Sequence, residues 1–320
     1  DTYLPHKFID VSKGDHGEYT ALQSYADRLL AFKHGLVHII NIANPNPANW
    51  YLEDTIKYAG VSYSYSVTKT DLGIAWVSES GCYLYDGSRV RNLTDNKLGI
   101  SEVPISDSTY SAWHEFSNGS LNAKDAMIGY DPITRSLIMF TSPNDNSANS
   151  NIGYIYDFNS NGWSYHTQIF TNSAYYTNFV HDWNNNLVVG KYDGSSDVEF
   201  KKFLPVPVST ASQEFQTRDI DFGLPGIRKK IYSVRITYRA GTNTQANPLK
   251  YAINGDSDVT NSFSTTTLGT ASDWDVGVFT ASSPIRCQSI RFRMDLPSTG
   301  TFEMNDMTIE YRIIKSKKVT

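Results

Sequence analysis

The chain has 320 residues, a formal net charge of −5 and 19% charged side chains. This length suits two domains, or one large all-β domain with an appendage, and the mildly acidic balance argues against a generally basic nucleic-acid binder. No apolar run approaches the roughly 18 residues that a membrane-spanning helix needs, so we expect no membrane partner. Tyr, Ser, Thr, Asn and Gly are abundant, which is typical of strands and tight turns.

Short strands separated by Asp, Asn or Gly turns fill the first two thirds of the sequence. Residues 25–42 read as two strands around Lys33-His34-Gly35, and residues 71–94 read as three strands. Further strand pairs are predicted at 126–142 and 153–166, and strands with turns at 182–186 and 192–197 are predicted within 177–203. Asp and Asn suit these bends because their side chains bond to nearby backbone and tolerate positive φ. A short helix is expected only at 107–116.

The strand groups start near residues 26, 71, 127 and 177, at intervals of 45, 56 and 50 residues. Blades of β-propellers repeat at about 40–50 residues. We therefore predict a β-propeller-like domain over residues 1–208 with four visible blades, and a fifth if 1–20 or 50–68 add strands. Because propellers have about four to eight blades, we expect any missing blades to precede Asp1 in a longer protein.

The pattern changes after residues 204–212, where two prolines and small polar residues indicate a linker. Alternation of apolar and polar residues recurs in the segments 229–239, 249–255, 274–279, 285–296 and 302–314. Such alternation is typical of half-buried antiparallel strands. We predict an antiparallel β-sandwich over residues 209–320, with a bulge at Asn305-Asp306.

The two predicted domains differ in charge. Residues 213–320 carry 14 Lys and Arg against 11 Asp and Glu, which gives +3, while residues 1–212 carry 14 against 22, which gives −8. Four arginines face outward on predicted strands of the second domain: Arg235, Arg239, Arg291 and Arg293. They either pair with acidic neighbours such as Glu310 and Asp295, or form an interface with an acidic partner, another subunit or nucleic acid.

The sequence gives little support for a catalytic or metal-binding site. His34 and His38 stand four residues apart, but on a turn and a strand rather than a helix, and no third metal ligand is indicated. Residues 254–265 begin like a calcium loop and then lack its Gly and Glu, so a hairpin turn is the better interpretation. Cys82 and Cys287 read as buried thiols without a bridge. No nucleophile, phosphate-loop or zinc motif occurs, so we expect no enzyme, no cofactor and no metal.

Exposed aromatic side chains on the blade loops support an alternative function. Tyr and Trp give contact area at low entropic cost, which suits a carbohydrate- or receptor-binding surface. Trp50, Trp163 and Trp183 are the side chains on which such binding would depend. Strand propensity accounts for most tyrosines equally well.

Residues 73–94 and 127–167 resemble propeller blades of structural proteins from tailed bacteriophages, and stretches within residues 219–313 resemble the β-sandwich that follows such a propeller. Nozzle proteins of the tail tube in short-tailed phages are the nearest kind. The resemblance implies a virion component of the tail or head–tail assembly, built in the host cytoplasm. It would pack against other virion proteins and against copies of itself in a ring, with DNA passing nearby without specific binding.

Overall fold

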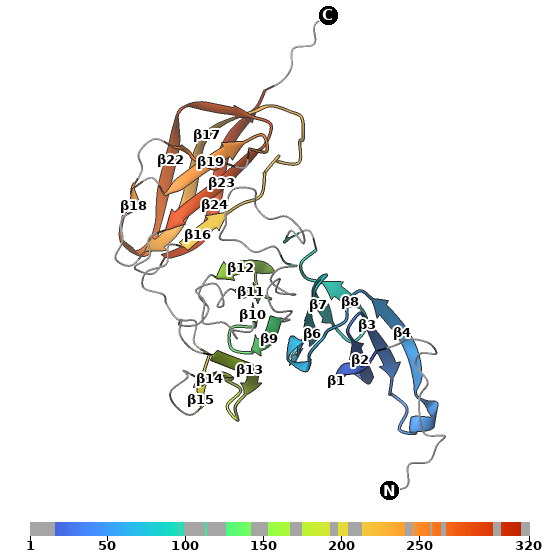
Figure 1. The fold of residues 1–320 in the computed structure, drawn as a ribbon. Helices are drawn as coiled ribbons and strands as arrows, with labels where there is room; N and C mark the ends of the chain where they lie inside the picture. The colour runs from blue at the N-terminus through green and yellow to red at the C-terminus, as the bar shows by residue number, and fades with distance from the viewer. Residues whose placement is uncertain are drawn as a thin grey trace, which may run out of the picture. The chain divides into compact units, whose positions relative to one another are not determined.

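The computed structural model describes residues 17–95, 97–98, 113, 126–141, 153–166, 175–192, 198–203, 213–240, 245–246, 248–256, 258–263, 267–296 and 302–314 (Figure 1). The chain divides into two compact units, Asp1–Val206 and Pro207–Thr320. The regular elements of the described residues are β-strands, two short 3-10 helices and one helical residue, Trp113, and every strand pair is antiparallel. The protein is therefore all-β. Residues 204–212 and, apart from Trp113, the predicted helix at 107–116 lie outside the described residues.

Four sheets make up the first unit, and each consists of strands that follow one another along the chain. The first sheet contains β1 (Tyr19–Tyr25), β2 (Arg28–Lys33), β3 (Leu36–Asn41) and β4 (Tyr51–Lys57). The second contains β5 (Val67–Thr70), β6 (Gly73–Ser78), β7 (Gly81–Tyr85) and β8 (Val90–Asn92). The third contains β9 (Ala126–Asp131), β10 (Ser136–Thr141), β11 (Gly153–Asp157) and β12 (Gly162–His166). The fourth contains β13 (Tyr175–His181), β14 (Leu187–Tyr192) and β15 (Glu199–Lys202).

The stretch 50–68 does not form a sheet of its own. It supplies β4 to the first sheet and starts β5 of the second, and the 3-10 helix Ser64–Ser66 lies between them. A second 3-10 helix, Pro47–Asn49, precedes β4; its Asn46 side chain accepts a hydrogen bond from the Ala48 N–H. The sheets therefore start some residues earlier than the sequence pattern indicated.

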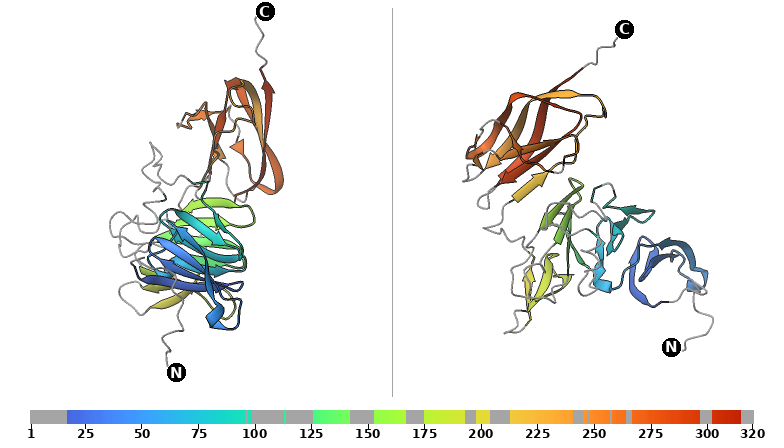
Figure 2. Two further views of the ribbon diagram at one scale, coloured as in Figure 1. Left: turned by 90° about the vertical axis from the view of Figure 1, so that its right-hand side faces the viewer. Right: turned by 45° about the horizontal axis from the view of Figure 1, so that its top comes forward.

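Apolar clusters join each sheet of the first unit to the next. Phe32 of β2 packs in one cluster with Trp76 of β6, which links the first and second sheets. Leu84 of β7 and Leu137 of β10 share another cluster, and Phe140 of β10 shares a third with Val189 of β14. Figure 2 shows the blue, cyan and green sheets stacked in chain order.

Central strands of the second and third sheets contribute to two clusters at once. Along β6, Ile74 and Trp76 face the first sheet, while Ala75 and Val77 face the third. Every residue of β6 is buried, whereas all four residues of the edge strand β15 are exposed. A strand covered on both faces needs apolar residues at successive positions, which explains why its sequence lacks clean alternation.

A glycine is required where β6 begins. Gly73 has φ +146°, a conformation that other residues rarely adopt, and an added Cβ would collide with the carbonyl oxygen of Tyr85. The side chain of Thr70 accepts from the Leu72 N–H and donates to the Gly73 carbonyl, so this tight turn is fixed by short-range hydrogen bonds.

The second unit has two main sheets and one short strand pair. The β23 sheet has the order β16 (Gln213–Gln216), β23 (Ile290–Leu296), β19 (Leu249–Ile253) and β20 (Asn261–Ser262). The β17 sheet has the order β22 (Ala271–Cys287), β17 (Lys229–Ala240) and β24 (Phe302–Ile313). The pair consists of β18 (Gln245–Ala246) and β21 (Thr267–Leu268).

Both main sheets of the second unit line one core. Ile236 and Phe279 of the β17 sheet and Leu249 and Phe292 of the β23 sheet belong to a single buried cluster. Each of these sheets has one covered and one open face, and buried residues therefore alternate with more exposed ones along most of β17 and along β23. Lys229 is also fully buried at the end of β17.

Two details of the predicted strands are settled by the register. Thr237 pairs with Asp306 and Tyr238 with Met304, so Asn305 forms the expected bulge. The prediction of one strand over 285–296 was wrong, because β22 ends at Cys287 and β23 starts at Ile290. The chain passes from one sheet to the other there, and the alternation shifts by one residue, because Cys287 and Ile290 are buried while Gln288 and Ser289 lie between them.

Within the described residues, none of the helical segments is long and apolar enough to span a membrane.

Candidate functional site

The four arginines of the predicted interface lie on two different sheets. Arg235 and Arg239 belong to β17, while Arg291 and Arg293 belong to β23. Each alternates with core residues of its strand, so its side chain points away from the shared core. Since the two sheets form opposite walls of that core, the expected single stripe consists of two pairs on opposite faces.

On the β17 sheet, Arg239 is engaged by its neighbours. Its guanidinium forms a 2.6 Å ion pair with Glu303 of β24 and lies 5.4 Å from the ring centroid of Trp274 on β22. Arg235 is exposed and has no ion pair within the described residues. Glu310, a partner considered for these arginines, instead accepts a 2.7 Å hydrogen bond from the Ser233 hydroxyl.

On the β23 sheet, both arginines have carboxylate partners. Arg291 lies 2.8 Å from Asp219, and Arg293 lies 2.7 Å from Asp295, which also pairs with Lys250 at 2.6 Å. Partial burial raises the pKa of Asp295, but hydrogen bonds from Lys250 and Arg293 outweigh it, and the net pKa is lowered. These two arginines stabilise their own sheet.

Aspartates at strand ends act as turn residues, as the repeated sequence phrase indicated. Each accepts a hydrogen bond from the backbone N–H two positions later, at 2.8–3.0 Å, in Asp86, Asp131, Asp157 and Asp182. Burial raises the pKa of Asp86, but hydrogen bonds from the backbone of Arg89 and from Ser88 outweigh it and lower the pKa to about 2. The pKa of Asp157 is lowered in the same way. Such carboxylates remain ionised near neutral pH and are poor proton donors.

The described histidine side chains do not gather in one site. His34 Nδ1 lies 2.5 Å from the Ser62 hydroxyl, and the buried His38 has its Nδ1 3.0 Å from the Thr55 hydroxyl. His181 Nε2 lies 2.7 Å from the Tyr130 carbonyl oxygen. In the part of the chain that the structure describes, no three His, Cys, Asp or Glu side chains are placed to hold a metal ion.

A turn occupies the start of the calcium-like stretch 254–265. Asn254 has φ +57°, and its side-chain oxygen accepts a 2.7 Å hydrogen bond from the Gln288 N–H. Asp256 accepts from the Asp258 N–H at 3.0 Å. The side-chain oxygens therefore bind backbone, as a turn requires.

Both cysteines are buried and lie in separate units. Burial raises the pKa of the Cys82 thiol and, despite the nearby charge of Lys229, that of the Cys287 thiol. Neither thiol is placed to act as a nucleophile near neutral pH.

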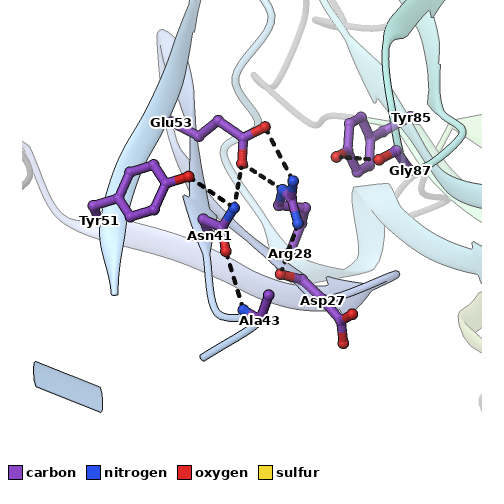
Figure 3. Close-up of polar contacts among 8 residues, drawn as sticks. All are labelled: Asp27, Arg28, Asn41, Ala43, Tyr51, Glu53, Tyr85 and Gly87. Carbon is purple, nitrogen blue, oxygen red and sulfur yellow. Dashed lines mark hydrogen bonds and ion pairs between the residues drawn. The ribbon is translucent and has the colours of Figure 1, made fainter. Parts of the chain in front are cut away.

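A polar cluster on the first sheet was not identified from the sequence (Figure 3). Arg28 of β2 forms an ion pair with Glu53 of β4. From the strand between them, the Asn41 side-chain amide donates to Glu53 at 3.0 Å and to the Tyr51 hydroxyl at 3.1 Å. The hydrogen bond with Glu53 raises the pKa of Arg28 against a smaller effect of burial.

The carboxylate of this cluster is satisfied internally, although the buried Nε of Arg28 makes no hydrogen bond. The two carboxylate oxygens of Glu53 accept from Arg28 and Asn41, so the group is not poised as a general base. The nearby Tyr85 hydroxyl donates to the Gly87 carbonyl at 2.9 Å. Only the register reveals the cluster, because it pairs Arg28 with Asn41 and Asn41 with Tyr51.

Of the three tryptophans considered for ligand binding, one is freely accessible. The Trp50 indole N–H donates to the Asn44 carbonyl at 2.7 Å, and that of Trp163 donates to the Leu93 carbonyl at 3.0 Å. Trp163 also packs against Trp113, with ring centroids 5.9 Å apart. Trp183, in the turn between β13 and β14, is 94% exposed.

No protein-family model and no curated protein sequence matches the chain. Among solved structures, the extracellular domain of a hybrid two-component system from B. thetaiotaomicron is similar over 57% of this chain, with 12% identity and a TM-score of 0.32. The chain spans 22% of the length of that protein.

Two other solved structures cover more of the chain. An exo-β-1,3-galactanase from Phanerochaete chrysosporium matches 89% of this chain and 78% of its own, with 9% identity and a TM-score of 0.30. A Cry1Da tryptic core variant from Bacillus thuringiensis matches 93% of this chain and 51% of its own, with 10% identity and a TM-score of 0.23. TM-scores below 0.5 carry no argument about function.

Proposed function

We propose that the first unit is a β-propeller, partial or complete, and that the second is a β-sandwich. Support for the propeller comes from the apolar clusters that join each sheet of the first unit to the next sheet in chain order, as between the blades of a propeller. Support for the sandwich is the single core lined by the β17 and β23 sheets.

We further propose that the protein is a structural component of a tailed-bacteriophage particle, in the tail or at the head–tail junction. It acts by packing against other particle proteins and against its own copies in a ring, without catalysis. The stacking of sheets in chain order is the observation that carries the proposal, together with the resemblance of the blade and sandwich sequences. DNA passes nearby without specific binding, which suits the −8 charge of residues 1–212.

Of the four interface arginines, Arg235 remains the best contact for a partner, because the other three are held by carboxylates of their own unit. Truncating a residue that already has an internal partner would disturb the unit as well as any interface. Arg235→Ala is the cleaner variant for testing assembly.

The direct experiment is to purify particles from an infected culture of the source and quantify their proteins by mass spectrometry. Peptides of this chain should occur in a fixed ratio to other structural proteins, and antibodies against it should label the tail or the head–tail junction in electron micrographs. Recovery of the chain only from particle-free fractions would contradict the proposal.

A carbohydrate- or receptor-binding module is the second candidate, and the 94% exposure of Trp183 is the observation that favours it. A glycan array should then show binding to defined sugars that Trp183→Ala removes. Trp50→Ala is a useful comparison, because the Trp50 indole already bonds to the Asn44 carbonyl.

A further inference from the structure

Three cations form a row across the β17 sheet. Lys230 of β17 is the direct cross-strand partner of Arg286 on β22 and of Arg312 on β24. Directly paired residues project from the same face of a sheet. The neighbours Lys229 and Ile231 are buried on the core side, so the row lies on the outer face.

No ion pair within the described residues holds the row, although Glu310 lies two residues from Arg312 on the same face. Within the described residues, the side chains of Lys230, Arg286 and Arg312 take part in no ion pair or hydrogen bond. With strands about 4.8 Å apart, the three cationic stems lie within roughly 10 Å. Like charges directly opposite one another destabilise a sheet, so this row favours an external anion.

A cavity adjoins one end of the row. It has a volume of about 300 Å³ and is lined by Arg228, Asn254, Arg286, Cys287 and Gln288. The turn at Asn254 is tied to the turn at Gln288 by a 2.7 Å hydrogen bond, which fixes two of its walls. Guanidinium groups match carboxylates in a two-pronged geometry, so Arg228 and Arg286 suit an oxyanion that enters the cavity.

A buried positive charge, that of Lys229, lies at the same end of the sheet as the cavity. The ammonium of Lys229 donates to the carbonyl oxygens of Leu224 at 2.6 Å and Gln288 at 2.7 Å. No carboxylate pairs with it within the described residues. Its positive charge therefore adds to the potential of the row and the cavity.

The rest of the same face suits a protein more than a nucleic acid. Trp274, Val276 and Val278 of β22 are 51%, 52% and 41% exposed, and a protein partner would bury such apolar side chains. Glu303 and Glu310 of β24 share this face with Arg239 and Ser233, their cross-strand partners. A phosphate backbone running along the sheet would meet these carboxylates, whereas a peptide can place its own carboxylates at the cationic row alone.

We propose that the outer face of the β17 sheet binds an acidic segment of a partner protein. Carboxylates of that segment contact Lys230, Arg286 and Arg312, one of them enters the Arg228–Arg286 cavity, and apolar side chains cover Trp274, Val276 and Val278. This inference does not depend on the proposed role in a phage particle.

Binding is measured by fluorescence anisotropy of the full chain with a labelled peptide in which Glu alternates with Thr and Val. The variant Lys230→Gln/Arg286→Gln/Arg312→Gln should bind at least tenfold more weakly. Its thermal midpoint without peptide should rise by about 2 °C, because the like-charge repulsion is gone. A merely structural role for the three cations would lower that midpoint instead.

The matched control is Lys57→Gln/Lys69→Gln/Arg218→Gln, which removes the same three charges from exposed positions elsewhere. It should keep the peptide affinity within twofold. The proposal is overturned if the peptide does not bind, if both variants lose affinity equally, or if an oligothymidylate of equal charge binds more tightly than the peptide. Loss of binding when Glu is replaced by Gln in the peptide would support it.

Discussion

The two units use charged residues in different places. In the first unit, carboxylates gather at strand ends, where Asp86, Asp157 and Asp182 accept backbone N–H groups. In the second, charges alternate along strands, and arginines occupy the open faces of the β17 and β23 sheets. The difference follows from burial: a strand covered on both faces, such as β6, has no solvent-facing position for a charge.

This contrast has an energetic consequence. Each core of the first unit is shared between neighbouring sheets, so a defect in one sheet affects the next. The second unit has one core and one buried ammonium. Because each core cluster of the described residues belongs to one unit, we expect the units to respond separately to core substitutions.

The largest expected effect tests that separation. Trp76→Ala should destabilise the first unit by about 3–5 kcal/mol, since it removes a fully buried indole and its 2.6 Å hydrogen bond to the Ala59 carbonyl. Differential scanning calorimetry should show one transition lowered and the other unchanged. Phe292→Ala, in the core of the second unit, should lower the other transition; a shift of both transitions by either variant would show that the units unfold together.

Lys229 provides the next test, confined to the second unit. Lys229→Ala leaves the carbonyls of Leu224 and Gln288 without their donor and should cost about 2–4 kcal/mol. Lys229→Met keeps the volume and should cost about half as much. Urea titration followed by the Trp274 signal reads this out, and an equal cost for both variants would mean that only the lost hydrogen bonds matter and packing does not.

Backbone strain distinguishes two glycines, one in each unit. Gly73→Ala should cost about 2–3 kcal/mol, because the φ of +146° is unfavourable and the new Cβ meets the Tyr85 carbonyl. Gly226→Ala has only the cost of φ +79°, about 1 kcal/mol, since no atom lies within 4 Å of the added Cβ. Comparable thermal midpoints for the two variants would contradict this ranking.

Acid should weaken the first unit through its turns. The pKa of Asp86 is lowered to about 2 in the folded chain, so its contribution is fully present above its ordinary pKa near 4 and is lost as pH falls toward 2. Asp86→Asn should remove about 1 kcal/mol at pH 7 and flatten the loss of stability between pH 4 and 2. Calorimetry across that range checks it; an unchanged slope would assign the acid sensitivity to other groups.

The smallest expected effect is that the two cysteine thiols do not react with a thiol reagent while the protein is folded. Cys82 and Cys287 are 0% and 2% exposed, one in each unit, so neither should react with a thiol reagent near neutral pH until its unit opens. In Trp76→Ala, Cys82 should react faster while Cys287 stays protected. Simultaneous labelling of both thiols would argue against separate opening.

The sequence predicted the strand content, the grouping of strands into meanders and the alternating strands of the second unit. It succeeded at β17 and β24, including the bulge at Asn305, because one-sided burial leaves a period-two pattern. It failed at 285–296, where both strands alternate but the alternation shifts by one residue at Gln288-Ser289 as the chain passes between sheets. The aspartate turns were predicted correctly, because an Asp side chain bonds to backbone only two residues away.

Local order was thus determined by the sequence itself, since strand alternation and turn chemistry depend on residues within a few positions. Tertiary structure decided which charges meet: it separated the four arginines onto opposite faces and brought Lys230 between Arg286 and Arg312. These partners lie 56 and 82 residues from Lys230 in the sequence. Only the pairing of strands and the packing of sheets fix such distant neighbours.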